Sequence, residues 1–268
     1  MPASDEEATK LANAAGFLFQ LRVEQEFSQR IILPGSMWKI AAREHRWTHT
    51  RASASGYIDL ILDTGTIFLV VECKRASNGL WVFLSNKHAP PMQRAKLLWT
   101  YRKPGFDPVA DWTDFAVTPP SAEAMFCIVR GHGEDGTPML ERVASNLILA
   151  TEALAEEELA LSNPSDLAKP RVFIPLLITN AELRVLRANP DAVDLATGRL
   201  DTTKSDAVAL VRFRKSLASA IPSRQSTASI TEAAQAGERT VLVMQSTALL
   251  ETFKELDIPY KGWPWENL

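Results

Sequence analysis

The sequence "YIDLILDTGTIFLVVECKR", residues 57–75, decides how the rest of the chain is interpreted. Two apolar segments flank a turn signal, which predicts a β-hairpin. Apolar strands normally exclude charge, yet Asp59, Glu72 and Lys74 interrupt these two. With a two-residue turn at 64–65, Asp59 becomes a diagonal neighbour of Glu72, roughly 7–8 Å away, on a face that also carries Lys74.

Side chains alternate along a strand, so the hairpin has two faces. One face is wholly apolar and is expected to pack into the core. The other carries the three charges and is expected to open onto a cavity that water or a ligand can reach. The apolar set is Ile58, Leu60 and Leu62 with Ile67, Leu69, Val71 and Cys73, and the charged set is Tyr57, Asp59, Ile61 and Asp63 with Phe68, Val70, Glu72 and Lys74.

Two carboxylates that share a site repel each other unless a cation lies between them. Mg²⁺ characteristically takes one or two carboxylates together with waters and phosphate oxygens. A lysine beside the metal can orient the attacking water or neutralise charge on a phosphate. The charged face therefore favours metal-dependent hydrolysis of phosphodiester bonds. A simpler interpretation is that Glu72 and Lys74 form an ion pair on an exposed sheet face while Asp59 caps a nearby group.

The motif formed by Asp59 and, after twelve residues, Glu72-Cys73-Lys74 resembles that of the PD-(D/E)XK nuclease superfamily. The resemblance covers the N-terminal part of the chain, from the first helix through Lys74 or as far as Tyr101. The proline of the family motif is missing, because Ile58 precedes Asp59. The acid and the acid-x-lysine element match position for position across the predicted hairpin.

This resemblance implies a restriction-endonuclease-like fold and a Mg²⁺-dependent deoxyribonuclease, with Mn²⁺ able to substitute. The metal would be held by Asp59, Glu72, the carbonyl of Cys73 and Glu24, while Lys74 positions the water that attacks phosphorus. DNA is expected as the substrate rather than RNA, with endonuclease action, because most relatives cut DNA. A homodimer is possible, because many such enzymes dimerise to cut both strands. The alternative is a noncatalytic nucleic-acid-binding or scaffold protein that retains the fold.

A helix is expected from Glu6 to about Ile31, with no proline before Pro34. Members of the family often carry an acid on the first core helix that points at the metal. We assign this role to Glu24, which lies on or beside the buried stripe of the helix. Gln20, four residues earlier, is a weak candidate for the same position.

Two other acids near the motif are expected to be structural. Glu26 is flanked at four-residue spacing by Arg22 and Arg30, which predicts an exposed ion-pair ladder. Glu44 lies on a strand expected at Met37–Trp47 and is a weaker site candidate than Glu24. A salt bridge is the expected role of Glu44.

The segment from Lys74 to Phe106 contains seven lysines and arginines, interleaved aromatic residues and no acid. The whole chain has a net charge of -3, so a segment whose charged residues are all basic predicts a surface that contacts phosphates. Gln93 is a weak candidate, because some relatives place a helix glutamine near the site. The basic residues assigned to nucleic-acid binding are Arg75, Lys87, Arg94, Lys96, Arg102 and Lys103.

The whole sequence predicts a mixed α/β fold, with a central sheet flanked by helices. Its 268 residues, 46% of them hydrophobic, suit a single domain with a catalytic core at about 6–185 and additional strands and a terminal helix at 186–268. Residues 92–101 are expected to form a short helix. The two cysteines provide neither a disulfide framework nor a metal-binding pair. The acidic N-terminus and the lack of a long apolar run predict a cytoplasmic protein.

Overall fold

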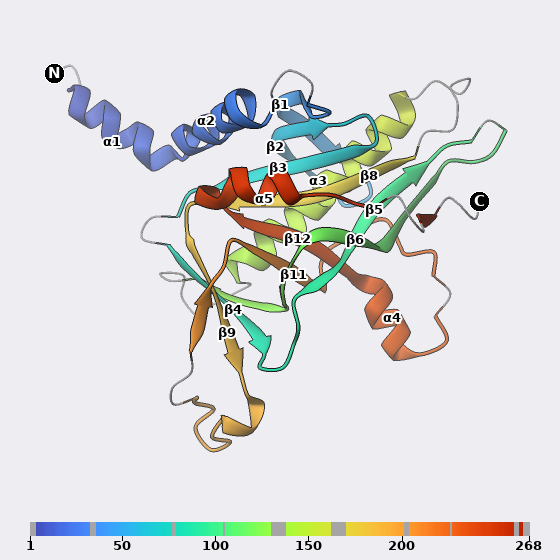
Figure 1. Cartoon of the computed structure of the whole chain (residues 1–268). Coiled ribbons are helices and arrows are strands. Elements are labelled where there is room, and N and C mark those ends of the chain that lie inside the picture. The colour runs from blue at the N-terminus through green and yellow to red at the C-terminus, as the bar shows by residue number, and fades with distance from the viewer. Residues whose placement is uncertain are drawn as a thin grey trace.

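The strands of the protein form two sheets, and helices cover the larger one (Figure 1). The computed structural model describes residues 4–32, 36–76, 79–103, 105–129, 138–161, 170–200, 204–225, 227–259 and 263–264. The helices are α1 Asp5–Ala15, α2 Phe17–Glu26, α3 Met139–Leu161, α4 Ile230–Gly237 and α5 Leu249–Glu255, with a π-helical turn at Phe27–Ile31 and 3-10 turns at Pro190–Ala192 and Ser246–Ala248. The strands are β1 Lys39–His49, β2 Ala54–Asp63, β3 Ile67–Lys74, β4 Leu80–Asn86, β5 Met92–Tyr101, β6 Val109–Ala124, β7 Phe126–Val129, β8 Arg171–Thr179, β9 Glu182–Ala188, β10 Ser205–Ala207, β11 Leu210–Ser216 and β12 Glu238–Gln245.

The larger sheet has the strand order β1-β2-β3-β8-β12-β11-β6-β5, and β5 also pairs with β8. Five strands, β8, β12, β11, β6 and β5, therefore close into a barrel, and β1, β2 and β3 extend the sheet from it. The second sheet has the order β10-β9-β4-β7. The general prediction of a mixed α/β fold with helices flanking a central sheet is confirmed.

Pro175 lies inside β8, a position where a proline would normally remove a ladder hydrogen bond. The N–H of Val172 donates to the carbonyl of Thr66, 2.9 Å away, so the backbone nitrogen of residue 175 points to the opposite edge of the strand. On that edge the pairing with β5 ends at Phe173 and the pairing with β12 begins at Leu176. The proline therefore falls where β8 changes partner.

Two neighbouring strands of the larger sheet continue directly into the second sheet. β3 and β8 are parallel neighbours, and the strands that follow them, β4 and β9, are parallel neighbours again. At the bend the N–H of Ala76 donates to Oδ1 of Asn180 at 2.6 Å. A Cβ on Gly79 would meet the Cβ of Ala76 at 2.3 Å and that of Ala181 at 3.0 Å, so the bend requires a glycine.

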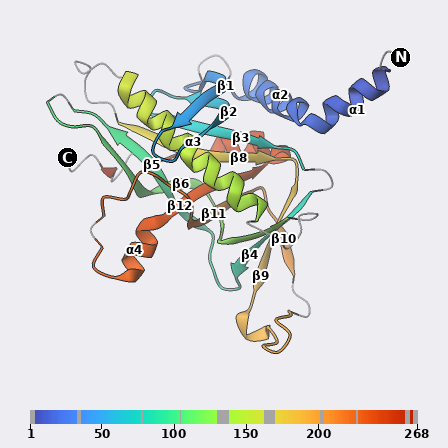
Figure 2. The same ribbon diagram turned by 180° about the vertical axis from the view of Figure 1, so that it is seen from behind.

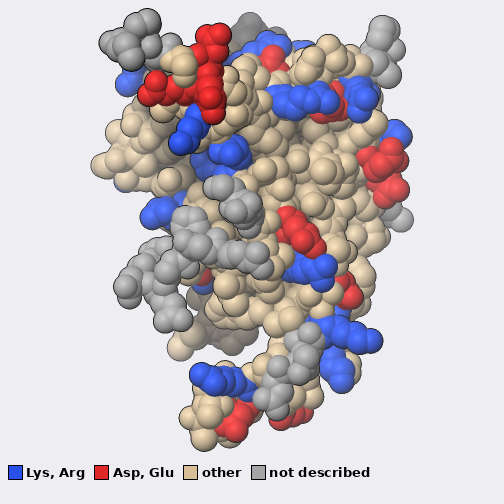
Figure 3. Space-filling model, turned by 90° about the vertical axis from the view of Figure 1, so that its left-hand side faces the viewer, with Lys and Arg blue, Asp and Glu red and all other residues tan. Residues whose placement is uncertain are grey.

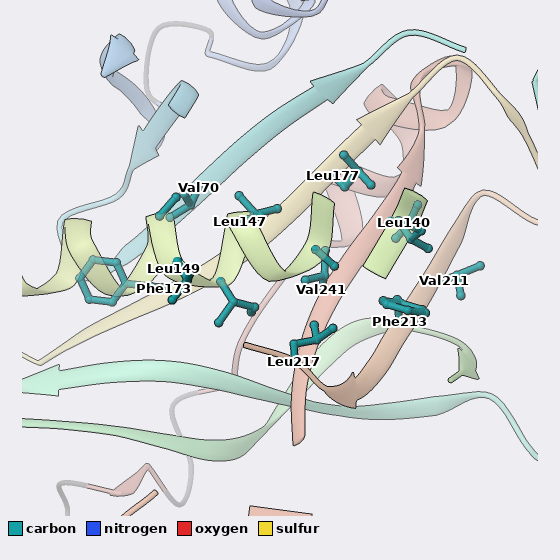
Figure 4. Close-up of a cluster of buried hydrophobic side chains, with 14 of the residues drawn as sticks. Val70, Leu140, Leu147, Leu149, Phe173, Leu177, Val211, Phe213, Leu217 and Val241 are labelled. Carbon is teal, nitrogen blue, oxygen red and sulfur yellow. The ribbon is translucent and has the colours of Figure 1, made fainter. Parts of the chain in front are cut away.

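Two hydrophobic layers enclose the larger sheet. Helix α3 lies across one face (Figure 2), where its Leu147 lies near Val70 of β3 and its Leu140 lies near Leu177 of β8 and Val241 of β12 (Figure 4). The other face packs against α2 and α5, with Val23 and Phe27 from the N-terminal segment and Leu249 and Phe253 from α5. In the part of the chain that the structure describes, no helix combines the length and apolar character needed to cross a membrane.

The expected first helix is divided into two at Gly16, which has φ 83°. Helix α1 extends away from the sheet in both views (Figures 1 and 2) and buries none of its residues. The prediction of a helix at residues 92–101 is wrong, because this segment is strand β5. Its residues from Ala95 to Thr100 are all buried, and a continuous apolar run of this kind does not distinguish a buried strand from a helix.

Candidate active site

The turn of the β2–β3 hairpin lies one residue later than the sequence suggested. The N–H of Thr64 donates to the carbonyl of Ile67 at 3.0 Å, which makes 65–66 the turn. The strands are thereby displaced by two residues relative to the predicted register, which leaves every side chain on its predicted side of the ladder. Continuing the observed register places Asp59 directly opposite Glu72 rather than diagonal to it.

The two strands of the hairpin separate at this point. Their ladder ends at the pair Leu60 and Val71. On its other edge, the ladder between β1 and β2 skips the pair formed by Glu44 and Asp59. Glu44 has φ 47°, a left-handed conformation that is uncommon outside glycine and that often accompanies functional sites. Asp59 therefore lies in a local opening of the sheet.

The opening changes which faces of β2 are buried. Ile58 and Ile61 both pack in the layer under α3, whereas Leu60 packs in the opposite layer. The expected apolar face is thus divided between two layers. Phe68 and Val70 of the charged face are also buried under α3, so the expectation that the charged face is open is correct only at the end of the hairpin.

The carboxylate of Asp59 is half-buried in this opening. Its Oδ2 accepts a hydrogen bond of 2.6 Å from the N–H of Cys73. Burial, and next the nearby charge of Glu72, raise the pKa of Asp59 to about 7, while the Cys73 N–H and the Lys74 ammonium act in the opposite direction. The N–H and C=O of one residue point to the same edge of a strand, so the Cys73 carbonyl is directed into the gap that holds Asp59.

Glu72 and Lys74 form an ion pair beside Asp59. Nζ of Lys74 lies 2.5 Å from Oε1 of Glu72, with the lysine side chain 40% exposed and the glutamate side chain 19% exposed. Burial alone would lower the pKa of Lys74, but the charge of Glu72 and its hydrogen bond, together with Asp59, raise it overall. Lys74 is therefore a protonated cation next to two carboxylates.

A cavity of about 150 Å³ lies on the α3 side of Glu72 and Lys74. One wall comes from β1, β2 and β3 and the other from α3. Among the described residues, Asp59 is at the strand separation rather than in the lining of this cavity. The lining residues are Trp47, Ser55, Gly56, Tyr57, Ile58, Glu72, Lys74, Val143, Asn146, Leu147 and Ala150.

The structure connects the strand opening to α2 through Gln20 rather than through Glu24. Nε2 of Gln20 donates to Oε1 of Glu44, and the charge of Glu44 contributes to the raised pKa of Asp59. Glu24 instead forms an ion pair with Arg43 of β1. The sequence assigned Glu44 to a salt bridge, but its described partner is the amide of Gln20.

Glu26 behaves as the sequence predicted. It forms ion pairs with Arg22 and Arg30 one turn before and after it. Both pairs lie at four-residue spacing, with the arginine side chains 57% and 60% exposed and the Glu26 side chain 18% exposed.

The six basic residues assigned to nucleic acid lie on several elements. Arg75 is exposed after β3 and lines a groove beside α1, and Lys87 is exposed after β4. Arg94 is exposed on β5, and Gln93 is exposed beside it on a strand rather than a helix. Figure 3, which shows the left-hand side of Figure 1, has lysines and arginines interspersed with acids on that face.

The assignment of Lys96 to phosphate binding is wrong, because this residue is only 2% exposed. Its Nζ donates to the carbonyl of Gln235 in α4 at 3.0 Å, and burial lowers its pKa. Arg102 donates to the carbonyl of Leu159 at 2.8 Å. Lys103 lies over the ring of Phe106, 4.9 Å from its centroid.

The donor atoms at the strand separation suit a hard cation. The Asp59 and Glu72 carboxylates and the Cys73 carbonyl are oxygen donors, and Mg²⁺ commonly takes two carboxylates from a protein. Burial, and next the charge of Glu72, raise the pKa of Asp59, and a cation held between the two acids would act against both causes. No group of three or more histidine, cysteine, aspartate or glutamate side chains is placed to hold a metal ion within the described ranges.

Both cysteines are free, with Cys127 buried.

Two residues of the cavity wall had no signal in the sequence. Trp47 on β1 and Asn146 on α3 reach the cavity only because α3 crosses β1, β2 and β3 (Figure 2). Residue 146 is separated from Glu72 by more than seventy positions, and nothing local in either segment indicates that they meet. Comparison with protein-family models, with curated proteins and with solved structures finds no match to this chain, so its function must be argued from the site.

Proposed function

We propose that the protein is a Mg²⁺-dependent nuclease of the PD-(D/E)XK type, with Asp59, Glu72 and Lys74 as its active-site triad and DNA as its substrate. One observation carries the proposal. An acid from β2 lies opposite an acid from β3, with a lysine two residues later, at the point where the two strands separate. The finer description of the fold as a restriction-endonuclease-like core belongs to the same proposal.

Each residue has a role that its environment supports. Asp59, Glu72 and the Cys73 carbonyl would hold the ion, and α2 contributes through Gln20, which donates to Glu44 of β1 beside the opening. Bound there, magnesium supplies Lewis acidity that stabilises charge on the scissile phosphate. Lys74 is held by Glu72 with its ammonium group partly exposed, so it can hold the attacking water or neutralise the phosphate.

The proposal is tested by incubating the protein with plasmid, linear duplex, single-stranded DNA and RNA in Mg²⁺, in Mn²⁺ and in chelator. Lys74→Ala and Asp59→Ala are each expected to reduce metal-dependent cleavage at least about 100-fold, the scale typical of a lost catalytic group. Lys254→Ala is the matched control, because it removes an exposed lysine that pairs with Glu251 on α5.

Cleavage that persists in both Lys74→Ala and Asp59→Ala would show that the chemistry occurs elsewhere. Binding without cleavage under every metal condition would favour a noncatalytic nucleic-acid-binding protein. Cleavage of RNA but not DNA would retain the site and change the substrate.

A further inference from the structure

The cavity beside Glu72 and Lys74 has two different walls. The β-sheet wall carries the charged pair, and the α3 wall carries Leu147 and Ala150, which are 3% exposed each. At the edge of the α3 wall, Asn146 is exposed to solvent and provides an amide. The cavity therefore joins an apolar interior to polar groups at its opening.

An aromatic side chain is fixed inside this space. Trp47 lines the cavity and is 6% exposed. Its indole is packed so closely on β2 that a Cβ at Gly56 would lie 3.1 Å from its Nε1. The glycine therefore leaves room for the indole against the strand, and this packing holds the ring in place without a ligand.

The size of the cavity limits what can enter. Its volume of about 150 Å³ is well below the roughly 300–1,000 Å³ of typical small-molecule pockets. It can take one ring or one phosphate group, but a base pair is too large. Because α3 covers this side of the sheet (Figure 2), a duplex cannot be laid against Glu72 from here.

We propose that this cavity receives a single unpaired base of the strand to be cut, and that the preferred substrate is therefore single-stranded or locally unpaired nucleic acid. The inference rests on the proposed function, since it places the base next to the groups that would act on its phosphate. Aromatic and apolar walls contact the faces of a base, and an amide pairs with its edge. A paired base would first have to leave its stack, which disfavours intact duplex.

The test measures binding by fluorescence anisotropy in chelator, with three labelled probes of equal length. These probes are a single strand, the same strand annealed to its complement, and a strand of abasic residues. The wild-type protein is expected to bind the single strand at least about tenfold more tightly than either of the other probes. Equal affinities, or no measurable binding, would overturn the inference.

Two substitutions locate the effect. Asn146→Ala is expected to lower the preference for the single strand about fivefold or more, and Ala150→Leu, which fills the cavity, is expected to remove it. Ser145→Ala is the control, because it changes the neighbouring position on α3, which does not line the cavity. Because Asn146 is exposed, its replacement tests the cavity even if Ala150→Leu fails to fold. A preference unchanged in Asn146→Ala would overturn the inference.

Cleavage distinguishes this inference from the proposed function. Metal-dependent cutting that requires Lys74 but proceeds equally on single strand and duplex would contradict the base-binding cavity and leave the nuclease in place. A preference for unpaired bases without cutting under any metal would contradict the nuclease and leave the cavity in place.

Discussion

The carboxylate of Asp59 accepts a hydrogen bond of 2.6 Å from the backbone N–H of Cys73, across the gap that opens between β2 and β3. This bond holds the aspartate in position although neither edge of β2 pairs regularly there. The hydrogen bond also favours the ionised carboxylate and so lowers the pKa of Asp59. Burial and the charge of Glu72 have the larger, opposite effect, so the pKa remains raised. Two of the following predictions depend on this balance.

Replacing Asp59 by asparagine should stabilise the metal-free protein above pH 7. The folded pKa of about 7 lies above the unfolded value of 3.8, so the contribution of Asp59 to stability is fully present below pH 4 and is lost as the pH rises through 7. Asparagine stays neutral and can still accept from Cys73. The gain in unfolding free energy at pH 8 should be about 1–2 kcal/mol after allowance for solvent screening, and close to zero at pH 4. Urea unfolding of the wild type and Asp59→Asn in chelator at pH 4 and pH 8 measures this gain. An equal difference in unfolding free energy at the two pH values would contradict the prediction.

Magnesium should raise the melting temperature of the wild type by more than that of Asp59→Asn. Burial and then the charge of Glu72 raise the pKa of Asp59, and a cation between the two acids would offset both. At a magnesium concentration of 100 times the dissociation constant, the stabilisation is about 2.7 kcal/mol. Differential scanning fluorimetry in magnesium and in chelator measures it. Sodium chloride at matched ionic strength is the control, and an equal shift in both salts would argue against a specific site.

Lys74→Met should separate activity from folding. The pair with Glu72 is partly exposed, so its loss should cost less than about 1 kcal/mol of unfolding free energy. Cleavage should nevertheless fall at least about 100-fold, because in the proposed mechanism the ammonium group would act on the reacting phosphate. Chemical denaturation and cleavage are measured on one preparation. A loss of activity in proportion to a loss of folded protein would indicate a structural role.

Some features of the β2–β3 hairpin can be predicted from residues close together in the sequence, and others cannot. The hairpin and its three charged residues follow from strand alternation, which depends only on neighbours in the chain. The observed register differs from the predicted one by two residues, because turns at 64–65 and at 65–66 both contain Gly65. In the observed turn the N–H of Gly65 donates to Oδ1 of Asp63 and the N–H of Ile67 donates to Oγ1 of Thr64. The left-handed conformation of Glu44 arises where two ladders open together, and no residue type indicates it in advance.

Long-range contacts explain the other differences. Lysine is usually a surface residue. Lys96 is instead buried, and its ammonium group donates a hydrogen bond to the carbonyl of Gln235, 139 positions away in the sequence. The sequence of strand β5 predicts a helix because closing the barrel buries both faces of the strand, which removes the alternation of an amphipathic strand. The helix position near the metal is assigned to Glu24, with Gln20 as a weak candidate, but Glu44 of β1 accepts from Gln20 while Arg43 pairs with Glu24.

Glu152→Gln should destabilise the protein by about 2 kcal/mol or more. The Glu152 side chain is fully buried and accepts from Trp112 Nε1, Ser219 Oγ and the backbone N–H groups of Ala220 and Ile221. An amide in its place points an N–H group at another donor. Glu157→Gln is the control, since that side chain is 43% exposed. Thermal unfolding of both variants checks the prediction, and similar melting temperatures would contradict it.

Gly79→Ala should cost about 1–3 kcal/mol, because the added methyl group overlaps the Cβ atoms of Ala76 and Ala181. Gly237→Ala is the control. There the new Cβ would lie 3.5 Å from Oγ of Ser216, an ordinary contact, so the change should be neutral or slightly stabilising. Denaturant unfolding compares the two, and equal stability of both variants would show that the bend has room for a side chain.

The bend at Gly79 also constrains how the chain can vary. β3 and β8 leave the larger sheet side by side and enter the second sheet still paired in the same order. An insertion in only one of the two connections would shift the register between β4 and β9. Length changes in 75–79 and 180–181 should therefore occur together or not at all. In an engineering library, single insertions at these two places should be selected against, while compensating double insertions survive.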